Sequence, residues 1–142
     1  MIERTNEAFA AAGLAARAKG LAGDFLADSS LPSGLATCDV FILKYILHDW
    51  DDASSRTILK KIKAVAKPGA RLAVVEHVLG VSGPFMERAK AMMDINMMAA
   101  NPPGAGERTF AEYAALFARA GFAKPPQLVK LRDLISTVVT EV

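Results

Sequence analysis

An apolar run over residues 40–47 ends at a polar segment over residues 48–52, and this junction constrains the fold more than any other part of the sequence. The run lacks the apolar–polar alternation of a half-exposed strand, which is typical of a parallel strand covered on both faces. In open α/β sheets, ligands bind beyond the carboxyl ends of the strands. The sequence therefore predicts a buried strand over residues 39–46 that places His48, a side chain suited to proton transfer near neutral pH, at a functional edge.

The next thirty residues predict a helix and a second strand. Asp51 or Asp52 is a suitable N-cap for a helix whose apolar residues recur at helical spacing, and Pro68-Gly69 ends it. Residues 71–78 form a second apolar run with an acid near its end. A strand, a helix and a strand with tight connections make a βαβ unit, so we expect these two strands to be parallel.

The remaining elements are predicted from helical spacing, capping residues and alternation. They are a helix over about residues 3–19, a short strand over 21–26, a turn at 32–34, a Met-rich helix over 85–100, a helix from the capping box of Thr109 and Glu112 to Gly121, and a terminal hairpin within 126–142. The predicted fold class is α/β with a mostly parallel sheet.

Composition narrows the class of protein and of site. The 142 residues are 52% hydrophobic and 23% charged with a net charge of +2, which indicates one globular domain and no nucleic-acid partner. No apolar run approaches the ~20 residues that cross a bilayer, and residues 1–6 lack a signal peptide's apolar core, so we expect a soluble, cytoplasmic protein. With Cys38 as the sole cysteine and two histidines, we expect no disulfide and no metal cluster.

Several segments occur together in an order and at spacings that are more specific than any one of them. They are Gly23-Asp24-Phe25-Leu26, the segment from Leu43 to Asp52, Val74-Val75-Glu76, Asp94-Ile95-Asn96-Met97-Met98 and Glu107-Arg108-Thr109. Together they resemble the plant-type and bacterial O-methyltransferase family, of the caffeate and hydroxyindole type, which uses S-adenosylmethionine. The resemblance implies a Rossmann-like class I methyltransferase sheet.

The resemblance assigns His48 as the general base, with Glu76 and Glu107 as the carboxylates that flank it. Chemistry supports these residue types, because a hydroxyl is a poor nucleophile until a base such as a neutral imidazole removes its proton. A carboxylate bonded to one ring nitrogen fixes the tautomer and leaves the other nitrogen free to act as the base.

The resemblance also implies S-adenosyl-L-methionine as the cofactor, held by Asp24, Phe25, Lys44 and Trp50. An adenine ring needs a hydrogen-bonding partner at its edge and an apolar wall at its face, and these residue types offer both. Lys44 is notable because a lysine within a buried strand is rare without a partner.

Three further positions match residues that approach the acceptor in the family, namely Asp49, Asn96 and Met97. The acceptor class that the resemblance implies is a small hydroxylated aromatic metabolite. His77 has no matching role, and we expect it to be structural.

The family's glycine-rich loop and the ribose-binding acid, which belong to its first two strands, have no counterpart in this sequence. Gly104-Ala105-Gly106 follows no predicted strand, so it is not that loop. Residues 1–142 are therefore expected to be the carboxy-terminal part of a catalytic domain, with a truncated sheet and without the family's amino-terminal dimerisation domain.

Two readings remain open for a truncated sheet. The chain is an O-methyltransferase domain or part of one. Its sheet then closes in another way, is completed by a homo-oligomer or a partner chain that supplies the missing strands, or belongs to a longer reading frame. Alternatively, it is a non-catalytic remnant that assembles with a related chain through exposed strand edges and the Met-rich helix. A short-chain dehydrogenase is excluded, because the sequence has no Tyr-x-x-x-Lys and no dinucleotide loop.

Overall fold

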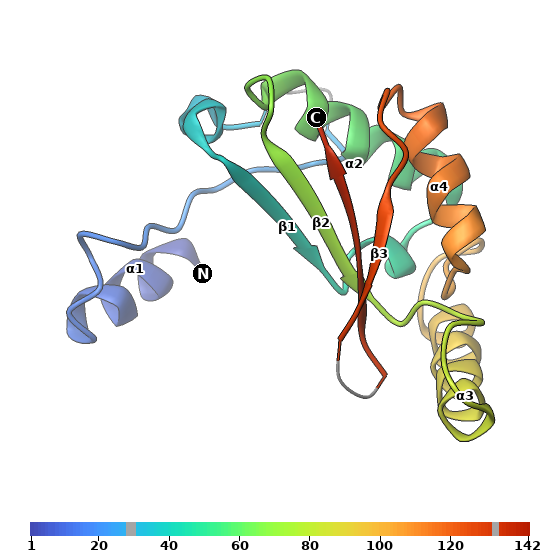
Figure 1. Ribbon diagram of the computed structural model, residues 1–142. Helices are drawn as coiled ribbons and strands as arrows, with labels where there is room; N and C mark the ends of the chain where they lie inside the picture. The colour runs from blue at the N-terminus through green and yellow to red at the C-terminus, as the bar shows by residue number, and fades with distance from the viewer. Residues whose placement is uncertain (28–30, 132–133) are drawn as a thin grey trace.

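The computed structural model of the protein describes residues 1–27, 31–131 and 134–142. Within them, a four-stranded sheet has the order β1-β2-β4-β3, with helices beside it (Figure 1). The strands are β1 (Val40–Lys44), β2 (Arg71–Glu76), β3 (Gln127–Lys130) and β4 (Ser136–Glu141). The helices are α1 (Ile2–Ala11), α2 (Asp52–Val65), α3 (Pro84–Ala100) and α4 (Phe110–Arg119), with 3₁₀ turns η1 (Ser33–Thr37) and η2 (Leu47–Asp49).

The β1-α2-β2 unit confirms the predicted βαβ arrangement. β1 and β2 are parallel, with Val40 opposite Arg71. Asp51 is the N-cap of α2, and its Oδ1 accepts a hydrogen bond from the backbone N–H of Ser54 at 2.8 Å. Because the strands are parallel neighbours, the segments that follow them leave the sheet at the same edge.

The prediction of a mostly parallel sheet is wrong. β4 pairs antiparallel with both β2 and β3, so among the described strands only the β1–β2 ladder is parallel. The predicted terminal hairpin is confirmed as β3 and β4, although residues 132–133 within it lie outside the described residues. The sheet is mixed because the hairpin turns back on itself and pairs its second strand with β2.

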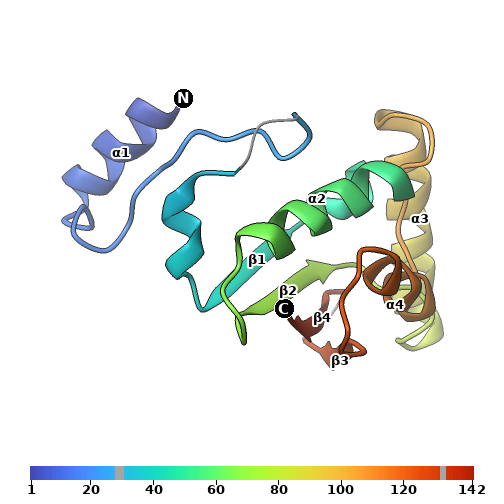
Figure 2. The ribbon, with the colours of Figure 1, turned by 90° about the horizontal axis from the view of Figure 1, so that it is seen from above.

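One face of the sheet forms the core. Side chains from β1, β2 and β4 pack there with α2 and α4, and Figure 2 shows α2 running along that side of the sheet. The buried apolar residues include Phe41, Leu47, Ile58, Leu59, Leu72, Val74, Leu116, Phe117 and Val138. On the other face, Val40 is 50% and Ile42 is 67% exposed, so the prediction that β1 is covered on both faces is wrong. The apolar run is exposed there because none of the described helices packs over these two side chains.

The amino-terminal region departs most from its prediction. α1 ends at Ala11 instead of near residue 19, has no buried residue and stands apart from the sheet (Figures 1 and 2). The predicted strand over residues 21–26 is absent, because Asp24 Oδ1 accepts hydrogen bonds from the backbone N–H groups of Leu26 and Ala27 and bends the chain locally.

The helices after β2 begin and end close to where the sequence places them. Thr109 and Glu112 form the predicted capping box of α4, and Gly121, at φ 90°, follows its end. α3 exposes Met92, Ile95 and Met98, whereas Lys90 is buried on its other side. Within the described residues, no helix combines the length and apolar character that crossing a bilayer requires.

Candidate active site

Three segments meet beyond the carboxyl ends of β1 and β2. His48 lies in η2 after β1, and His77 directly follows β2. The segment before α4 is joined to both, because the N–H of Gly106 donates to the carbonyl of His48 at 2.9 Å and the N–H of Leu79 donates to the carbonyl of Arg108 at 3.0 Å. These backbone contacts hold Glu107 between the two histidines.

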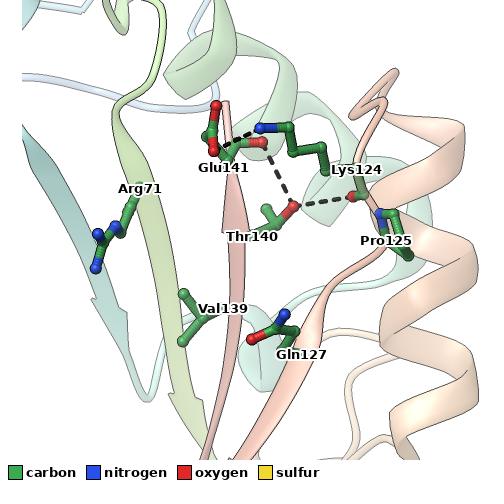
Figure 3. Close-up of a pocket in the computed structure, with 7 residues that line it drawn as sticks. All are labelled: Arg71, Lys124, Pro125, Gln127, Val139, Thr140 and Glu141. Atoms are coloured by element: carbon green, nitrogen blue, oxygen red, sulfur yellow. Dashed lines mark hydrogen bonds and ion pairs between the residues drawn. The ribbon is translucent and has the colours of Figure 1, made fainter.

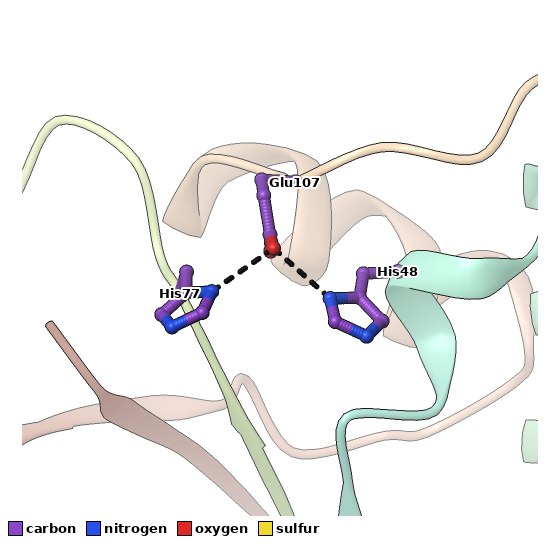
Figure 4. A group of neighbouring side chains, drawn as sticks. All are labelled: His48, His77 and Glu107. Atoms are coloured by element: carbon purple, nitrogen blue, oxygen red, sulfur yellow. Dashed lines mark hydrogen bonds and ion pairs between the residues drawn. The ribbon is translucent and has the colours of Figure 1, made fainter. Parts of the chain in front are cut away.

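Glu107 contacts both histidines through one oxygen atom. Its Oε1 lies 2.9 Å from Nδ1 of His48 and 3.0 Å from Nδ1 of His77 (Figure 4). All three residues are buried. A carboxylate accepts and does not donate, so this geometry assigns the hydrogen of each histidine to Nδ1 and leaves Nε2 as the acceptor.

Glu76 lies beneath the same histidine. It is fully buried, and its Oε1 accepts hydrogen bonds from the backbone N–H groups of Ile46 and Leu47 at 3.1 and 3.0 Å. Its Oε2 is 3.4 Å from Nδ1 of His48. Glu76 therefore anchors the start of η2 and adds a second carboxylate beside the imidazole.

The two carboxylates change the proton affinity of His48 and of each other. Burial alone would lower the pKa of His48, but the hydrogen bond to Glu107 and the charges of Glu76, Glu107 and Asp49 outweigh it, so the pKa is raised. Burial raises the pKa of Glu76 to about 7, despite the opposing effects of His48 and the two backbone donors. Among the described residues Glu76 Oε2 has no hydrogen-bond partner, so it offers a place for a retained proton.

The predicted cofactor residues are only partly brought together. Phe25 and Trp50 meet edge to face, with ring centroids 6.1 Å apart. Phe25 also lines an apolar cavity of about 300 Å³ beside β1, with Leu31, Leu35, Cys38, Phe41, Ile58 and Ile62 among its other lining residues. Lys44 is exposed and its Nζ lies 5.2 Å from the ring centroid of Tyr45, so the expectation of a buried lysine is wrong. Asp24 is exposed, and its Oδ1 accepts a backbone hydrogen bond within a local turn.

Of the predicted acceptor residues, one lies at the histidine. Asp49 Oδ1 is 3.5 Å from Nε2 of His48, the ring nitrogen that faces away from Glu107. Asn96 is exposed on α3. Met97 is half-buried, and its Sδ accepts a hydrogen bond from the side chain of Asn101. The described contacts therefore connect Asp49, and not the two α3 residues, to His48.

Sequence reasoning missed three residues of this cluster, namely His77, Tyr45 and Arg108. The sequence assigns His77 no role beyond a structural one, and the structure places it beside His48, where both contact Glu107. A signal was present: His77 follows Glu76 at a strand end, where ligands and catalytic groups gather. Arg108 likewise adjoins Glu107, and Tyr45 ends the apolar run.

Arg108 fixes the backbone around His48. It is 6% exposed, and its Nη1 and Nη2 donate to the carbonyls of Leu47 and Trp50, each at 2.8 Å. Its Nε donates to Asp52 Oδ1 at 3.1 Å. The planar guanidinium thus connects both ends of η2 to the start of α2, a task that the point charge of a lysine would not perform.

Replacing Arg108 by methionine is expected to lower the free energy of unfolding by about 2 kcal/mol, because two buried carbonyls lose a charged donor. The loss stays moderate since Ser55 Oγ also contacts both carbonyls, at 3.3 and 3.4 Å. Urea unfolding measures the effect. Arg119→Met is the matched control, because exposed Arg119 pairs with the same Asp52 and should cost less than about 1 kcal/mol. Equal losses in both variants would contradict the role given to Arg108.

The cluster also has the composition of a metal site. His48, His77 and Glu107 offer ligand atoms that all lie within 4.8 Å of one another. The sequence predicts no metal cluster from two histidines and one cysteine, and the structure adds the carboxylate of Glu107 beside the two histidines. The two N–O distances of 2.9 and 3.0 Å are those of hydrogen bonds.

Gly104 and Gly106 serve close packing. A Cβ on Gly104, whose φ is 93°, would lie 2.7 Å from Cβ of Asp51, and a Cβ on Gly106 would lie 2.9 Å from Asp94 Oδ1. The segment follows α3 and no strand, as the sequence predicts. These glycines therefore let the Glu107 segment approach α2 and α3.

A second cavity, of about 220 Å³, lies at the far end of the sheet, beside β4 (Figure 3). Its polar groups contact each other: Lys124 Nζ is 2.6 Å from Glu141 Oε2, and Thr140 Oγ1 donates to the carbonyl of Lys124 at 3.0 Å. None of the predicted site residues lines it.

The sequence matches a family of known proteins over most of its length. The profile of the O-methyltransferase domain matches residues 1–123. Mitomycin biosynthesis 6-O-methyltransferase of Streptomyces lavendulae is 31% identical over 140 residues, which cover 92% of this chain and 37% of the relative. Acetylserotonin O-methyltransferase of Mus musculus is 35% identical over 108 residues, 76% of this chain and 26% of the relative. The chain thus spans about a third of the length of these curated relatives.

Solved structures share the fold. The neocarzinostatin-biosynthesis O-methyltransferase NcsB1, solved with S-adenosylmethionine and 2-hydroxy-5-methyl naphthoic acid, has a TM-score of 0.79 and 29% identity, covering 99% of this chain and 38% of that one. Human N-acetylserotonin methyltransferase in complex with S-adenosylmethionine has a TM-score of 0.71 and 29% identity, covering 87% and 33%. The architecture is therefore that of part of a class I methyltransferase sheet.

Proposed function

The chain belongs to the O-methyltransferase domain family, and from this premise we propose that it carries the proton-accepting part of an O-methyltransferase, with His48 as the general base. The observation that supports the proposal is the contact between Glu107 Oε1 and Nδ1 of His48 at 2.9 Å. Because this bond occupies Nδ1–H, the lone pair of Nε2 is free to accept the proton of an acceptor hydroxyl.

The charges around His48 favour its protonated form. When Nε2 takes a proton, the imidazolium lies between Glu107 and Glu76, and both carboxylates stabilise it. The raised pKa of His48 brings the base closer to the pKa of a phenol, which is about 10. Asp49, 3.5 Å from Nε2, is placed to contact the acceptor or the proton in transit.

S-adenosylmethionine is the proposed methyl donor, and its sulfonium makes the methyl group open to attack by the acceptor oxygen. The aromatic pair Phe25 and Trp50 and the apolar cavity beside β1 fit the face of an adenine ring. Asp24 and Lys44, both exposed near this region, are the proposed polar contacts.

The proposed acceptor is a small hydroxylated aromatic compound. NcsB1, from neocarzinostatin biosynthesis, is solved with hydroxylated naphthoic acids, and the Streptomyces lavendulae relative is a 6-O-methyltransferase of mitomycin biosynthesis. A phenol suits the site, because its hydroxyl proton is acidic enough for an imidazole with a raised pKa to accept.

Methyl transfer tests the proposal. The assay uses radiolabelled S-adenosylmethionine with hydroxynaphthoic acids, the chain alone, and a completed chain in which the amino-terminal part of the Streptomyces lavendulae relative precedes it. We expect the completed chain to transfer the label to an acceptor hydroxyl. A completed chain that binds the cofactor and methylates none of the acceptors that the intact relative methylates would contradict the proposal.

A second candidate, an assembly module without activity, is favoured by the exposed apolar residues on the open face of β1 and on α3. Exposed apolar side chains that gather on one face of an element are typical of a surface that another chain covers. Titration of the chain with S-adenosylhomocysteine, followed by ¹H–¹⁵N correlation spectra, separates the two functions. Shifts at Phe25 and Trp50 support the methyltransferase, whereas a folded chain indifferent to the ligand supports the assembly module.

A further inference from the structure

We propose that His77 is a positioning residue of this site: by donating to the same Glu107 oxygen as His48, it limits how strongly Glu107 holds the protonated base. The inference deepens the proposed function and rests on His48 being that base. The shared oxygen is the observation that carries it, because Glu107 Oε1 lies 2.9 Å from one Nδ1 and 3.0 Å from the other.

Tyr45 contacts His77 at the ring nitrogen that does not face Glu107. Its hydroxyl lies 3.5 Å from Nε2 of His77, the nitrogen left as an acceptor when Nδ1–H donates to Glu107. The ring of Tyr45 stacks on that of His48, with centroids 5.6 Å apart and planes 17° apart. It also lies over His77, with centroids 5.2 Å apart. Tyr45, His77, Glu107 and His48 therefore form a closed ring of contacts.

The backbone conformation of Tyr45 supports a functional role for this closed set of contacts. Its φ is 54°, which makes it a left-handed residue other than glycine. A bulky residue rarely adopts this conformation, and backbone strain of this kind is found most often at functional sites. The strained backbone turns the ring over the two histidines immediately after β1, where the N–H of Tyr45 still donates to the carbonyl of Val75.

The charged and titratable groups around His77 come from each segment packed against it. Tyr45 follows β1, His48 and Asp49 lie in η2, Glu76 ends β2, and Glu107 precedes α4. Asp94 of α3 acts one step further away, because its Oδ1 accepts the backbone N–H of Glu107 at 2.8 Å. In this set, Glu107 and Tyr45 both contact the two histidines, and Glu107 Oε1 is the atom that accepts from both Nδ1–H groups. A change in donation at His77 therefore reaches His48 through Glu107.

Asparagine and glutamine at position 77 differ in whether the side chain can donate to Glu107. Both are neutral amides, so their other properties are alike. In H77N, the amide nitrogen takes about the place of Nδ1 and can still donate to Glu107. In H77Q, the amide nitrogen reaches about as far as Nε2, so Glu107 Oε1 loses its second donor. Neither side chain titrates or offers a ring to Tyr45, which makes the two variants a matched pair.

The test is the midpoint of His48 titration in the full chain, followed by ¹H–¹⁵N spectra of the imidazole nitrogens. We expect the midpoint in H77Q to lie about 0.5–1 pH unit above that in H77N, because an oxygen with one donor fewer accepts more strongly from His48. Equal midpoints, or a higher one in H77N, would overturn the inference. The titration midpoint is measured without methyl transfer, so its result does not depend on whether the chain is active.

The same pair has a catalytic readout in the completed chain. The pH at which methyl transfer reaches half of its maximum should be higher for H77Q than for H77N, by the same interval as the His48 midpoints. A pH profile shared by the two variants, with different maximal rates only, would indicate a structural role for His77 and would overturn the inference.

Discussion

Replacing His48 by glutamine is expected to lower the rate of methyl transfer by the completed chain about 10²–10⁴-fold, the usual contribution of a general base. The acceptor hydroxyl would then keep its proton as the oxygen attacks, whereas the binding of S-adenosylmethionine should change little. The variant also removes the ring that Tyr45 stacks on, so unfolding must be measured beside the rate. Radiolabel transfer at saturating cofactor gives the rate.

The control for this variant is Lys67→Gln, at an exposed ion pair with Asp39 far from the site. We expect it to retain the wild-type rate. Methyl transfer by H48Q that remains within about threefold of wild type, in a folded protein that binds the cofactor, would show that another group removes the proton. The pH profile adds a second check, because the loss should be smallest at high pH, where hydroxide and ionised acceptor replace the base.

Replacing Glu76 by glutamine is expected to change how stability depends on pH. Burial raises the pKa of Glu76 from 4.5 to about 7, so between these values the folded chain retains a proton that the unfolded chain releases. Stability must then fall as pH rises through this interval. At 1.36 kcal/mol per pH unit, the loss is about 3 kcal/mol by pH 8. The amide oxygen of glutamine can still accept from Ile46 and Leu47, and it carries no charge.

Denaturant unfolding of the wild type and E76Q between pH 4.5 and 8 measures this difference. We expect the free energy of unfolding of the wild type to fall by about 3 kcal/mol relative to that of E76Q across this range. Glu3→Gln, at an exposed position of α1, should follow the wild type. His48 contributes in the same direction, because its raised pKa gives stability that is lost as pH rises past 6.5. A constant difference between wild type and E76Q would contradict the buried-acid account.

The parts of the fold that the sequence predicted are those governed by local rules. The N-cap at Asp51, the capping box of Thr109 and Glu112, and the alternation of the terminal hairpin each depend on neighbours within a few residues. The parallel β1-α2-β2 unit follows from tight connections and handedness. Each of these predictions is confirmed, whereas the mostly parallel sheet and the strand over residues 21–26 are wrong.

Those errors share a physical cause, because the pairing and the burial of a strand depend on residues that are distant in sequence. A hydrophobic run shows that a strand forms, but not which faces other elements cover, so the exposure of Ile42 and Lys44 was not predictable from β1 itself. None of the described strands pairs with residues 21–26, and Asp24 closes a local turn there instead.

The candidate site was also predicted in part. The resemblance located His48, Glu76 and Glu107, and the structure brings all three together. His77 and Arg108 were missed because their roles depend on contacts across 30 and 61 residues, to Glu107 and to the carbonyl of Leu47. Adjacency to a predicted site residue was the available signal, since each follows one of the two glutamates.

The tautomer and the titration midpoint of His48 decide whether Glu107 holds this residue as a base. Long-range ¹H–¹⁵N correlation spectra of the full chain between pH 5 and 9 report which ring nitrogen carries the hydrogen and where the ring titrates. The geometry predicts Nδ1–H for neutral His48 and a midpoint above 6.5. An Nε2–H tautomer, or a midpoint below 6.5, would mean that Glu107 does not hold His48 as a base and would contradict the account.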